Sequence, residues 1–164
     1  MKILKCIFIC TLVCFTQAHA QVEPAWKLYY DSTQLFWAKD WGRTVNLLEK
    51  AEHSAVADLG IYHENYLTIL NDLGTAYWKA RDYAKAQLTL QKTLQLKSEV
   101  YPPTNKEVLL SVSNLAGFYQ EKGLWNKAKS LYNRILLLDP ASIPTDIFTT
   151  AAQNLVSIYD LSQL

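Results

Sequence analysis

Apolar side chains recur at intervals of three and four residues along most of the chain. Two adjacent runs with this spacing are Leu70, Leu73, Gly74 and Tyr77, followed by Tyr83, Ala86, Leu90 and Leu94. Such intervals place the side chains on one face of an α-helix. No segment shows sustained alternation with a period of two, and no Asn-Gly or Asp-Gly hairpin signal occurs. The pattern therefore predicts an all-α protein.

The helical pattern repeats itself every 42 residues. Large and small residues hold the same step: the aromatic Trp41, Tyr83 and Trp125, and the small Thr44, Ala86 and Ala128. The pair Leu73-Gly74 aligns with Leu115-Ala116, and a partial copy begins near Asn154. A period of this length indicates stacked pairs of helices, because neither helix of a pair can bury its apolar face alone. We expect the small residues to let the two helices of a pair approach each other.

Helix boundaries have signals of their own. Thr104 and Glu107 show the Thr-x-x-Glu spacing of a capping box, and Pro102-Pro103 stops the preceding helix. Asp40 and Asp82 are placed to cap the second helices of their units. These signals mark where the predicted helices begin and end.

The first twenty residues have the three parts of a secretory signal peptide. Lys2 and Lys5 flank the start, residues 6–15 are apolar, and Ala18-His19-Ala20 ends the segment. We predict cleavage between Ala20 and Gln21, and hence a secreted or periplasmic protein. A membrane anchor is the alternative, but a spanning helix needs about 20 apolar residues. Acylation of Cys14 as a lipoprotein is disfavoured, because Val13 stands where a small residue is wanted.

Composition narrows the range of functions. The chain has 164 residues, of which half are hydrophobic, with 16 basic and 15 acidic side chains. This balance argues against a strongly basic nucleic-acid binder and against a disordered acidic tail. Cys6, Cys10 and Cys14 all precede the predicted cleavage site, so residues 21–164 contain no disulfide or thiolate site.

Three segments in succession resemble a tetratricopeptide repeat: NLAGFY at 114–119, GLWNKA at 123–128 and LYNRIL at 131–136. The 42-residue step and the Tyr101-Pro102-Pro103 linker are similar to the longer variety in kinesin light chains. The resemblance implies a right-handed superhelical solenoid of antiparallel helix pairs. It divides the chain into a signal peptide (1–20), a divergent helix pair (21–61), two repeats (62–103 and 104–143) and a C-terminal helix (144–164). In the divergent pair, Asp31 and Ser32 replace the expected Leu-Gly or Leu-Ala, which leaves its packing open.

The resemblance further implies a concave groove, lined by the first helix of each pair, that binds peptide segments. The implied groove residues are Asn71, Thr75, Trp78, Lys79, Asn114, Gln120 and Asn154. An Asn recurs before the Leu-Ala pair in kinesin-light-chain-like repeats, and Asn114 and Asn154 match that position, while Asp72 does not. Asn suits the role because its amide both donates to and accepts from an extended backbone. Lys79 is the one basic residue among these positions, so capture of a C-terminal carboxylate is not expected.

Other interpretations of the same residues stay open. Asn114 is either a ligand contact or a solvated or capping side chain, and Trp78 either lines the groove or wedges between units. A dense aromatic group precedes the first clear repeat: Trp26, Tyr29, Tyr30, Phe36 and Trp37. On the basis of their spacing of three and four, we interpret five residues as core: Trp26, Tyr29, Tyr30, Trp37 and Trp41. A partner surface is the alternative, since aromatics are frequent at interface hot spots.

We predict no enzyme activity, cofactor or metal. The mature histidines His53 and His63 lack a metal-ligand spacing, and no glycine-rich phosphate loop or Gly-x-Ser-x-Gly elbow occurs. Nucleic acid is disfavoured because Lys127, Lys129 and Arg134 form only a modest patch.

The predicted function is thus an exported module that binds a peptide or protein partner in its groove, with no membrane span after signal cleavage. One alternative is the N-terminal head of a longer bacterial enzyme, such as one ending in a caspase-like peptidase domain. Another is a self-associating scaffold. The C-terminal helix is apolar on more than one side, with Leu155, Val156 and Tyr159, so it is a possible site of homo-oligomerisation.

Overall fold

A computed structural model describes residues 23–161 of the chain. These residues form seven α-helices and one short 3-10 helix, and no strand: α2 (Ala25–Trp37), α3 (Trp41–Leu59), α4 (Glu64–Lys79), α5 (Tyr83–Val100), α6 (Lys106–Glu121), α7 (Trp125–Leu136), η1 (Pro140–Ser142) and α8 (Thr145–Leu161). The predicted signal peptide lies outside the described residues.

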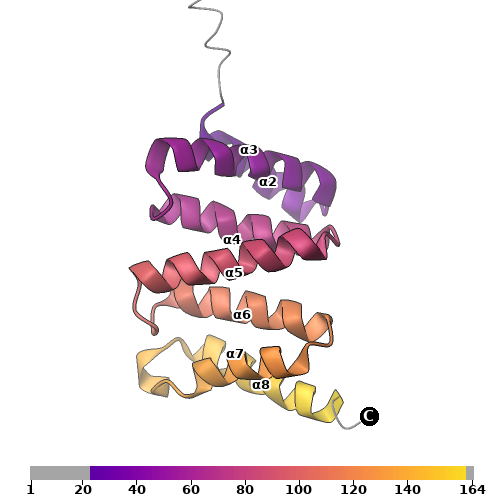
Figure 1. Cartoon of the computed structure of the whole chain (residues 1–164), viewed down its shortest axis with the longest axis vertical. Helices are drawn as coiled ribbons and strands as arrows, with labels where there is room; N and C mark the ends of the chain where they lie inside the picture. The colour runs from indigo at the N-terminus through magenta and orange to yellow at the C-terminus, as the bar shows by residue number, and fades with distance from the viewer. Residues whose placement is uncertain (1–22, 162–164) are drawn as a thin grey trace, which may run out of the picture.

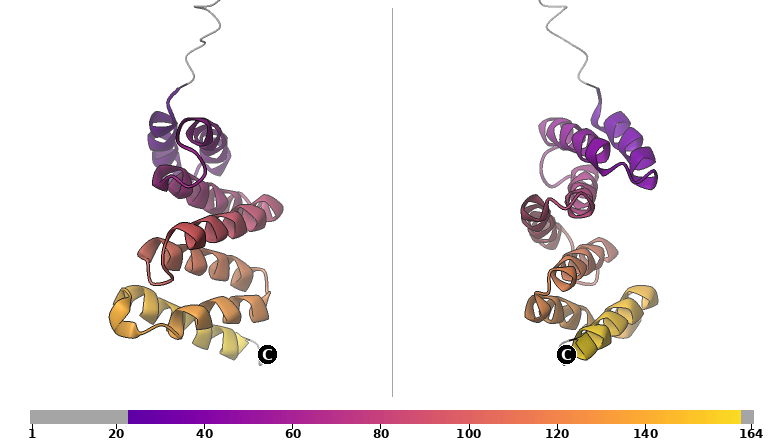
Figure 2. Two further views of the ribbon diagram at one scale, coloured as in Figure 1. Left: turned by 60° about the vertical axis from the view of Figure 1, so that its left-hand side comes forward. Right: turned by 90° about the vertical axis from the view of Figure 1, so that its right-hand side faces the viewer.

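The helices stack in pairs along the long axis of the molecule (Figure 1). α2 packs on α3, α4 on α5 and α6 on α7, and α8 covers the last pair. Each pair also contacts the next one through α3 with α4 and α5 with α6. Two further views show the pairs offset from one another, as in a solenoid (Figure 2). The predicted all-α solenoid of antiparallel helix pairs is confirmed.

Small residues hold the helices of a pair close together, as the sequence predicted. A Cβ atom built on Gly74 of α4 would lie 2.9 Å from Cδ2 of Leu90 and 3.3 Å from its backbone nitrogen. Ala116 of α6 holds the equivalent place in the next pair and is fully buried. Ala86, on the helix α5 that packs against Gly74, is fully buried as well. A Cβ atom is therefore accommodated at Ala116, whereas at Gly74 it would crowd Leu90.

The divergent first pair packs in the same way. Ser32 is buried where the other pairs have Gly74 or Ala116, and its Oγ donates to the carbonyl oxygen of Tyr29, one turn back. The hydroxyl is thereby satisfied inside its own helix. A small side chain, rather than an apolar one, is the requirement at this position.

Two of the three predicted helix starts are confirmed. The carboxylates of Asp40 and Asp82 accept hydrogen bonds from the third residue of α3 and α5 at 3.1 and 3.2 Å. The predicted capping box at Thr104 is wrong. Asn105 caps α6 instead, and its Oδ1 accepts from the backbone N–H of Glu107 at 2.8 Å. The helix begins one residue later than expected because the better capping side chain directly follows Thr104.

Three N-terminal aromatics that we interpreted as core lie on the surface. Trp26, Tyr30 and Trp37 are 71, 61 and 82% exposed, whereas Tyr29 and Trp41 are half-buried. The core interpretation is wrong for the three exposed residues. Their spacing puts them along one side of α2, and no other helix of the described part of the chain covers that side.

Tyrosine clamps join successive pairs. The hydroxyl of Tyr77 donates to Oε1 of Glu49 at 2.6 Å, and Nζ of Lys85 contacts the same oxygen at 3.1 Å. The hydrogen bond from Tyr77 lowers the pKa of Glu49, while burial raises the pKa of Tyr77. One repeat of 42 residues later, Gln91 donates to the hydroxyl of Tyr119 at 2.8 Å. The second clamp thus has a neutral amide where the first has a carboxylate.

Candidate functional site: the concave face

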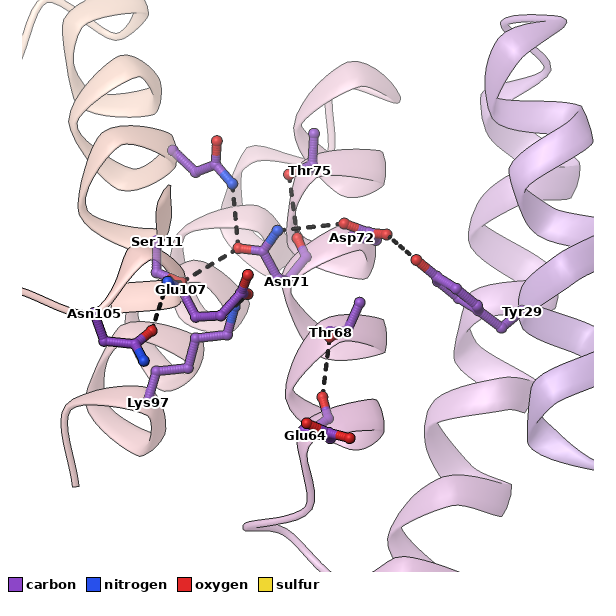
Figure 3. A network of polar contacts seen from close by, with 11 residues as sticks. Tyr29, Glu64, Thr68, Asn71, Asp72, Thr75, Lys97, Asn105, Glu107 and Ser111 are labelled. Atoms are coloured by element: carbon purple, nitrogen blue, oxygen red, sulfur yellow. Dashed lines mark hydrogen bonds and ion pairs between the residues drawn. The ribbon is translucent and has the colours of Figure 1, made fainter. Parts of the chain in front are cut away.

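A row of polar side chains crosses three successive first helices, α2, α4 and α6 (Figure 3). The Tyr29 hydroxyl donates to Oδ2 of Asp72 at 2.8 Å. Nδ2 of Asn71 donates to the other oxygen of Asp72 at 3.3 Å. Oδ1 of Asn71 then accepts from Nδ2 of Asn114 at 3.1 Å. The row fixes the spacing of the three helices on the side where the groove was predicted.

Burial sets the electrostatics of this row. Burial raises the pKa of Asp72, and the hydrogen bonds from Tyr29 and Asn71 act in the opposite direction. The pKa of Tyr29 is raised well above its usual value, first by burial and then by the charge of Asp72. A tyrosine in this state keeps its proton and acts as a donor. The row therefore holds Asp72 as an acceptor between two helices.

An ion pair with one buried partner lies next to the row. The side chain of Lys97, on α5, is 2% exposed, and its Nζ donates to Oε2 of Glu107 at 2.9 Å. Glu107 belongs to the first turn of α6 and is 45% exposed. The attraction of Lys97 also lowers the pKa of Asp72. This pair joins the last turn of α5 to the first turn of α6 and acts on the polar row through its charge.

The predicted groove residues of α4 are largely occupied by contacts within the protein. Thr75 donates from Oγ1 to the carbonyl oxygen of Asn71 at 3.1 Å. The Trp78 ring meets Phe118 of α6 edge-on, with the ring centroids 6.0 Å apart. Trp78 thus wedges between two pairs, which was one of its two interpretations. Its Nε1 is buried without a hydrogen-bond partner among the described residues. Lys79 is exposed, and its Nζ lies 4.6 Å from the centre of the Trp78 ring.

Gln120 and Asn154 meet at a tyrosine from the neighbouring helix. The Tyr132 hydroxyl, on α7, donates to Oε1 of Gln120 at 3.2 Å. Burial raises the pKa of Tyr132, and its hydrogen bond with Asn154 lowers it. The structure thus brings Asn71 and Asn114 into one cluster and Gln120 and Asn154 into another. Whether they contact a ligand stays a prediction.

Two cavities open between the first helices α2 and α4. The larger, of about 330 Å³, is lined by Pro24, Ala25, Trp26, Tyr29, Asp58, Leu59, Asn65, Thr68 and Ile69. The smaller, of about 240 Å³, is lined by Tyr29, Ser32, Thr33, Phe36, Trp37, Leu48 and Asp72. Tyr29 borders both cavities, and its hydroxyl donates to Asp72 in the lining of the smaller one. We call the two cavities together the α2–α4 channel.

Sequence reasoning missed the Tyr29–Asp72 bond, the α2–α4 channel and the buried Lys97. Tyr29 and Asp72 are 43 residues apart, about one repeat, which places them at the same height on successive first helices. That register was the available signal for the bond. The signal for the burial of Lys97 was weaker: this residue follows the apolar positions Leu94 and Leu96 at the end of α5.

Metal and membrane sites find no support in residues 23–161. No cluster of three or more histidine, cysteine or acidic side chains is arranged to hold a metal ion there. In the same range no helix has the length and hydropathy of a membrane span. His63 caps α4, and its Nδ1 accepts from the backbone N–H of Asn65 at 3.2 Å.

Comparison with solved structures decides the fold. BtubC (BKLC) from P. vanneervenii superposes with a TM-score of 0.77 over 85% of this chain and 56% of that one, at 13% identity. A putative kinesin light chain of Podosopora anserina with nearly identical TPR-like repeats gives 0.74 over 84% and 67%, at 17% identity. The fold is a tetratricopeptide-repeat solenoid. At these identities the likeness concerns the fold alone.

Sequence comparison agrees with the repeat type. The chain is 29% identical over 85 residues to the mitochondrial tetratricopeptide repeat protein 19 homolog of Drosophila melanogaster. That match covers 52% of this chain and only 22% of the relative. No protein-family model matches the sequence. The chain is thus similar to tetratricopeptide-repeat proteins and spans a small part of this curated relative.

Proposed function

We propose that the chain is an exported protein-interaction module that binds a peptide segment of a partner in the concave groove. One observation carries the proposal: the polar row from Tyr29 to Asn114 crosses the first helices of three successive pairs, and its Tyr29–Asp72 end lines the α2–α4 channel. The solenoid fold supports a scaffold role, because stacked repeats create extended binding surfaces.

The polar row prepares the groove for binding. Asn71 uses its carbonyl oxygen and one N–H inside the row, so its orientation is fixed. Asn114 donates one N–H to Asn71, and an amide carries a second N–H and a carbonyl oxygen. Side chains that are held in place before binding lose less entropy when a ligand arrives. A peptide backbone along α6 would therefore meet an oriented amide.

Peptide selection tests groove binding. A random peptide library is selected against the protein, and the affinity of the selected peptide is measured by fluorescence polarisation. The groove variant carries Asn114→Ala and Asn154→Ala. The control variant carries Asn126→Ala and Asn133→Ala, two exposed asparagines of α7. We expect the groove variant to bind about 10-fold more weakly, which corresponds to one lost amide contact or two. Equal affinity of the two variants would place the site elsewhere.

Export has a separate test, the mass of the mature protein. The predicted product of secretion from a bacterial host begins at Gln21, with the first twenty residues removed. Intact mass spectrometry of the exported protein distinguishes this product from the full chain and from a form acylated at Cys14. A mass other than that of residues 21–164 would refute the predicted cleavage.

A further inference from the structure

We propose that the α2–α4 channel binds an extended peptide segment carrying two basic side chains four residues apart. The proposal rests on the proposed function and specifies its ligand. Each cavity combines an exposed tryptophan, an aspartate and the end of a helix. The same three features at two places point to a repeated ligand group.

The larger cavity is suited to a long cationic side chain. The indole of Trp26 is exposed on its wall, and a cation over an indole face is attracted by the ring. Asp58 lies in the same lining, at the end of α3. The carboxyl end of a helix carries a partial negative charge, which adds to that of the aspartate. Leu59, which is 42% exposed in the same lining, supplies apolar surface for the methylene stem of lysine or arginine.

The smaller cavity repeats this arrangement. Trp37 is exposed on its wall at the end of α2, and Asp72 lies in the lining. Asp72 accepts one hydrogen bond on each oxygen, from Tyr29 and Asn71. A carboxylate offers about four acceptor positions, so two remain for a ligand. Since Asp72 is half-buried, salt would screen a cation that reaches it less than it screens a pair on the open surface.

Charge complementarity selects the sign of the ligand. No lysine or arginine lines either cavity of the described chain, and the charged lining residues, Asp58 and Asp72, are both acidic. The nearby Lys27 is already paired with Glu23. An acidic segment would bring like charges together in the channel, whereas a basic segment would pair with them.

The length of α2 sets the spacing of the two basic side chains. Trp26 and Trp37 are 11 residues apart on one helix, which corresponds to about 16 Å at 1.5 Å per residue. An extended chain advances about 3.3 Å per residue, so four residues span about 13 Å, and the long side chains of lysine or arginine cover the remaining distance of about 3 Å. Side chains four residues apart also point to the same side of an extended chain. Tyr29 then lies opposite the middle of the segment.

Designed peptides test the proposal. The probe is a fluorescein-labelled nine-residue peptide of alanine and serine, with arginine at its third and seventh positions. The comparison peptides carry glutamate at the same positions, or arginine at the third and fourth. We expect the arginine 3/7 peptide to bind at least 10-fold more tightly than the glutamate peptide and several-fold more tightly than the 3/4 peptide. Equal binding of the arginine and glutamate peptides would overturn the proposal.

Variants then locate the site. Trp26→Ala and Asp58→Asn are each expected to weaken binding of the arginine 3/7 peptide by three- to 10-fold. The controls are Leu137→Ala and Asp146→Asn, which change exposed residues far along the solenoid and should leave binding unchanged. Both residues of the test pair are exposed, so neither variant threatens folding. Loss of binding in the controls but not in the test pair would also overturn the proposal.

The two proposals fail in different ways. If a selected peptide loses affinity with the Asn114 and Asn154 variant but is acidic or neutral, groove binding stands and the basic specificity is wrong. If the arginine 3/7 peptide depends on Trp26 and Asp58 while the asparagine variant binds every peptide normally, the α2–α4 channel binds ligand and the wider groove does not.

Discussion

The ion pair between the buried Lys97 and the partly exposed Glu107 predicts an asymmetric response to mutation. Glu107→Gln keeps the shape of the side chain and removes its charge, which leaves the ammonium of Lys97 buried beside a neutral amide. Removing one partner of a buried ion pair typically costs about 3–5 kcal/mol. The carboxylate of Asp72 still attracts Lys97, which moves the expected loss to the lower end, about 3 kcal/mol.

Lys97→Met should behave differently. Methionine keeps most of the length and apolar surface of the stem and removes the buried charge. Glu107 is 45% exposed and therefore keeps water around its unpaired carboxylate. Replacing a buried charge with an apolar side chain of similar volume is often neutral or stabilising. We expect the free energy of unfolding to stay within about 1 kcal/mol of the wild-type value.

Urea unfolding followed by tryptophan fluorescence measures both variants, with the double variant as a control. The double variant should match Lys97→Met, because the charge that makes Glu107→Gln costly is then absent. The reasoning fails if Lys97→Met loses about as much stability as Glu107→Gln. In that case the pair itself, and not the cost of burying Lys97 alone, would stabilise the fold.

Three further predictions concern stability and assembly. Glu49→Gln should lower the free energy of unfolding by up to about 1 kcal/mol at neutral pH. Because the pKa of Glu49 is depressed in the folded protein, the stabilisation is present above the unfolded pKa. In a pH series of thermal melts, the difference between wild type and variant should therefore vanish as acid protonates the wild-type carboxylate. Gly74→Ala should cost about 1 kcal/mol, since overpacking against Leu90 exceeds the gain in helix propensity. Gly42→Ala is the control: an added Cβ has nothing within 4 Å, so this variant should gain a few tenths of a kcal/mol in the same melts. If α8 joins two copies, sedimentation should show a concentration-dependent dimer that Val156→Asp dissociates, and a monomer at every concentration would exclude this.

The repeat was readable from the sequence because packing imposes it at fixed intervals. Gly74 and Ala116 must be small wherever two helices cross closely, so they mark the first helices of their pairs. Asp40 and Asp82 were predicted correctly as caps because a capping side chain binds a backbone N–H in the first turn of its own helix. Asn105 was missed because Thr104 has similar capping chemistry, and a shift of one residue leaves the helical pattern unchanged.

Exposure was harder to read than helix position. Periodicity says that Trp26, Tyr30 and Trp37 share a side of α2, but not whether a neighbour covers that side. The positions of Asn71 and Asn114 on the inner helices followed from the repeat, whereas their mutual hydrogen bond depends on how two pairs are offset. The α2–α4 channel depends on the same offset, which no single helix encodes.

The tyrosine clamps give the solenoid junctions of unequal chemistry. The first junction holds Glu49 with Lys85 and Glu52 with Lys92, while the clamp of the second uses the uncharged Gln91. Added salt screens these partly exposed pairs, but it has little effect on the Gln91 contact or on the ion pair that the buried Lys97 makes with Glu107 at the second junction. In a linear array of repeats, each junction opens largely independently of the others. Amide hydrogen exchange should therefore accelerate first in α2 and α3 when salt is added. High ionic strength would then make the array unfold from its N-terminal end.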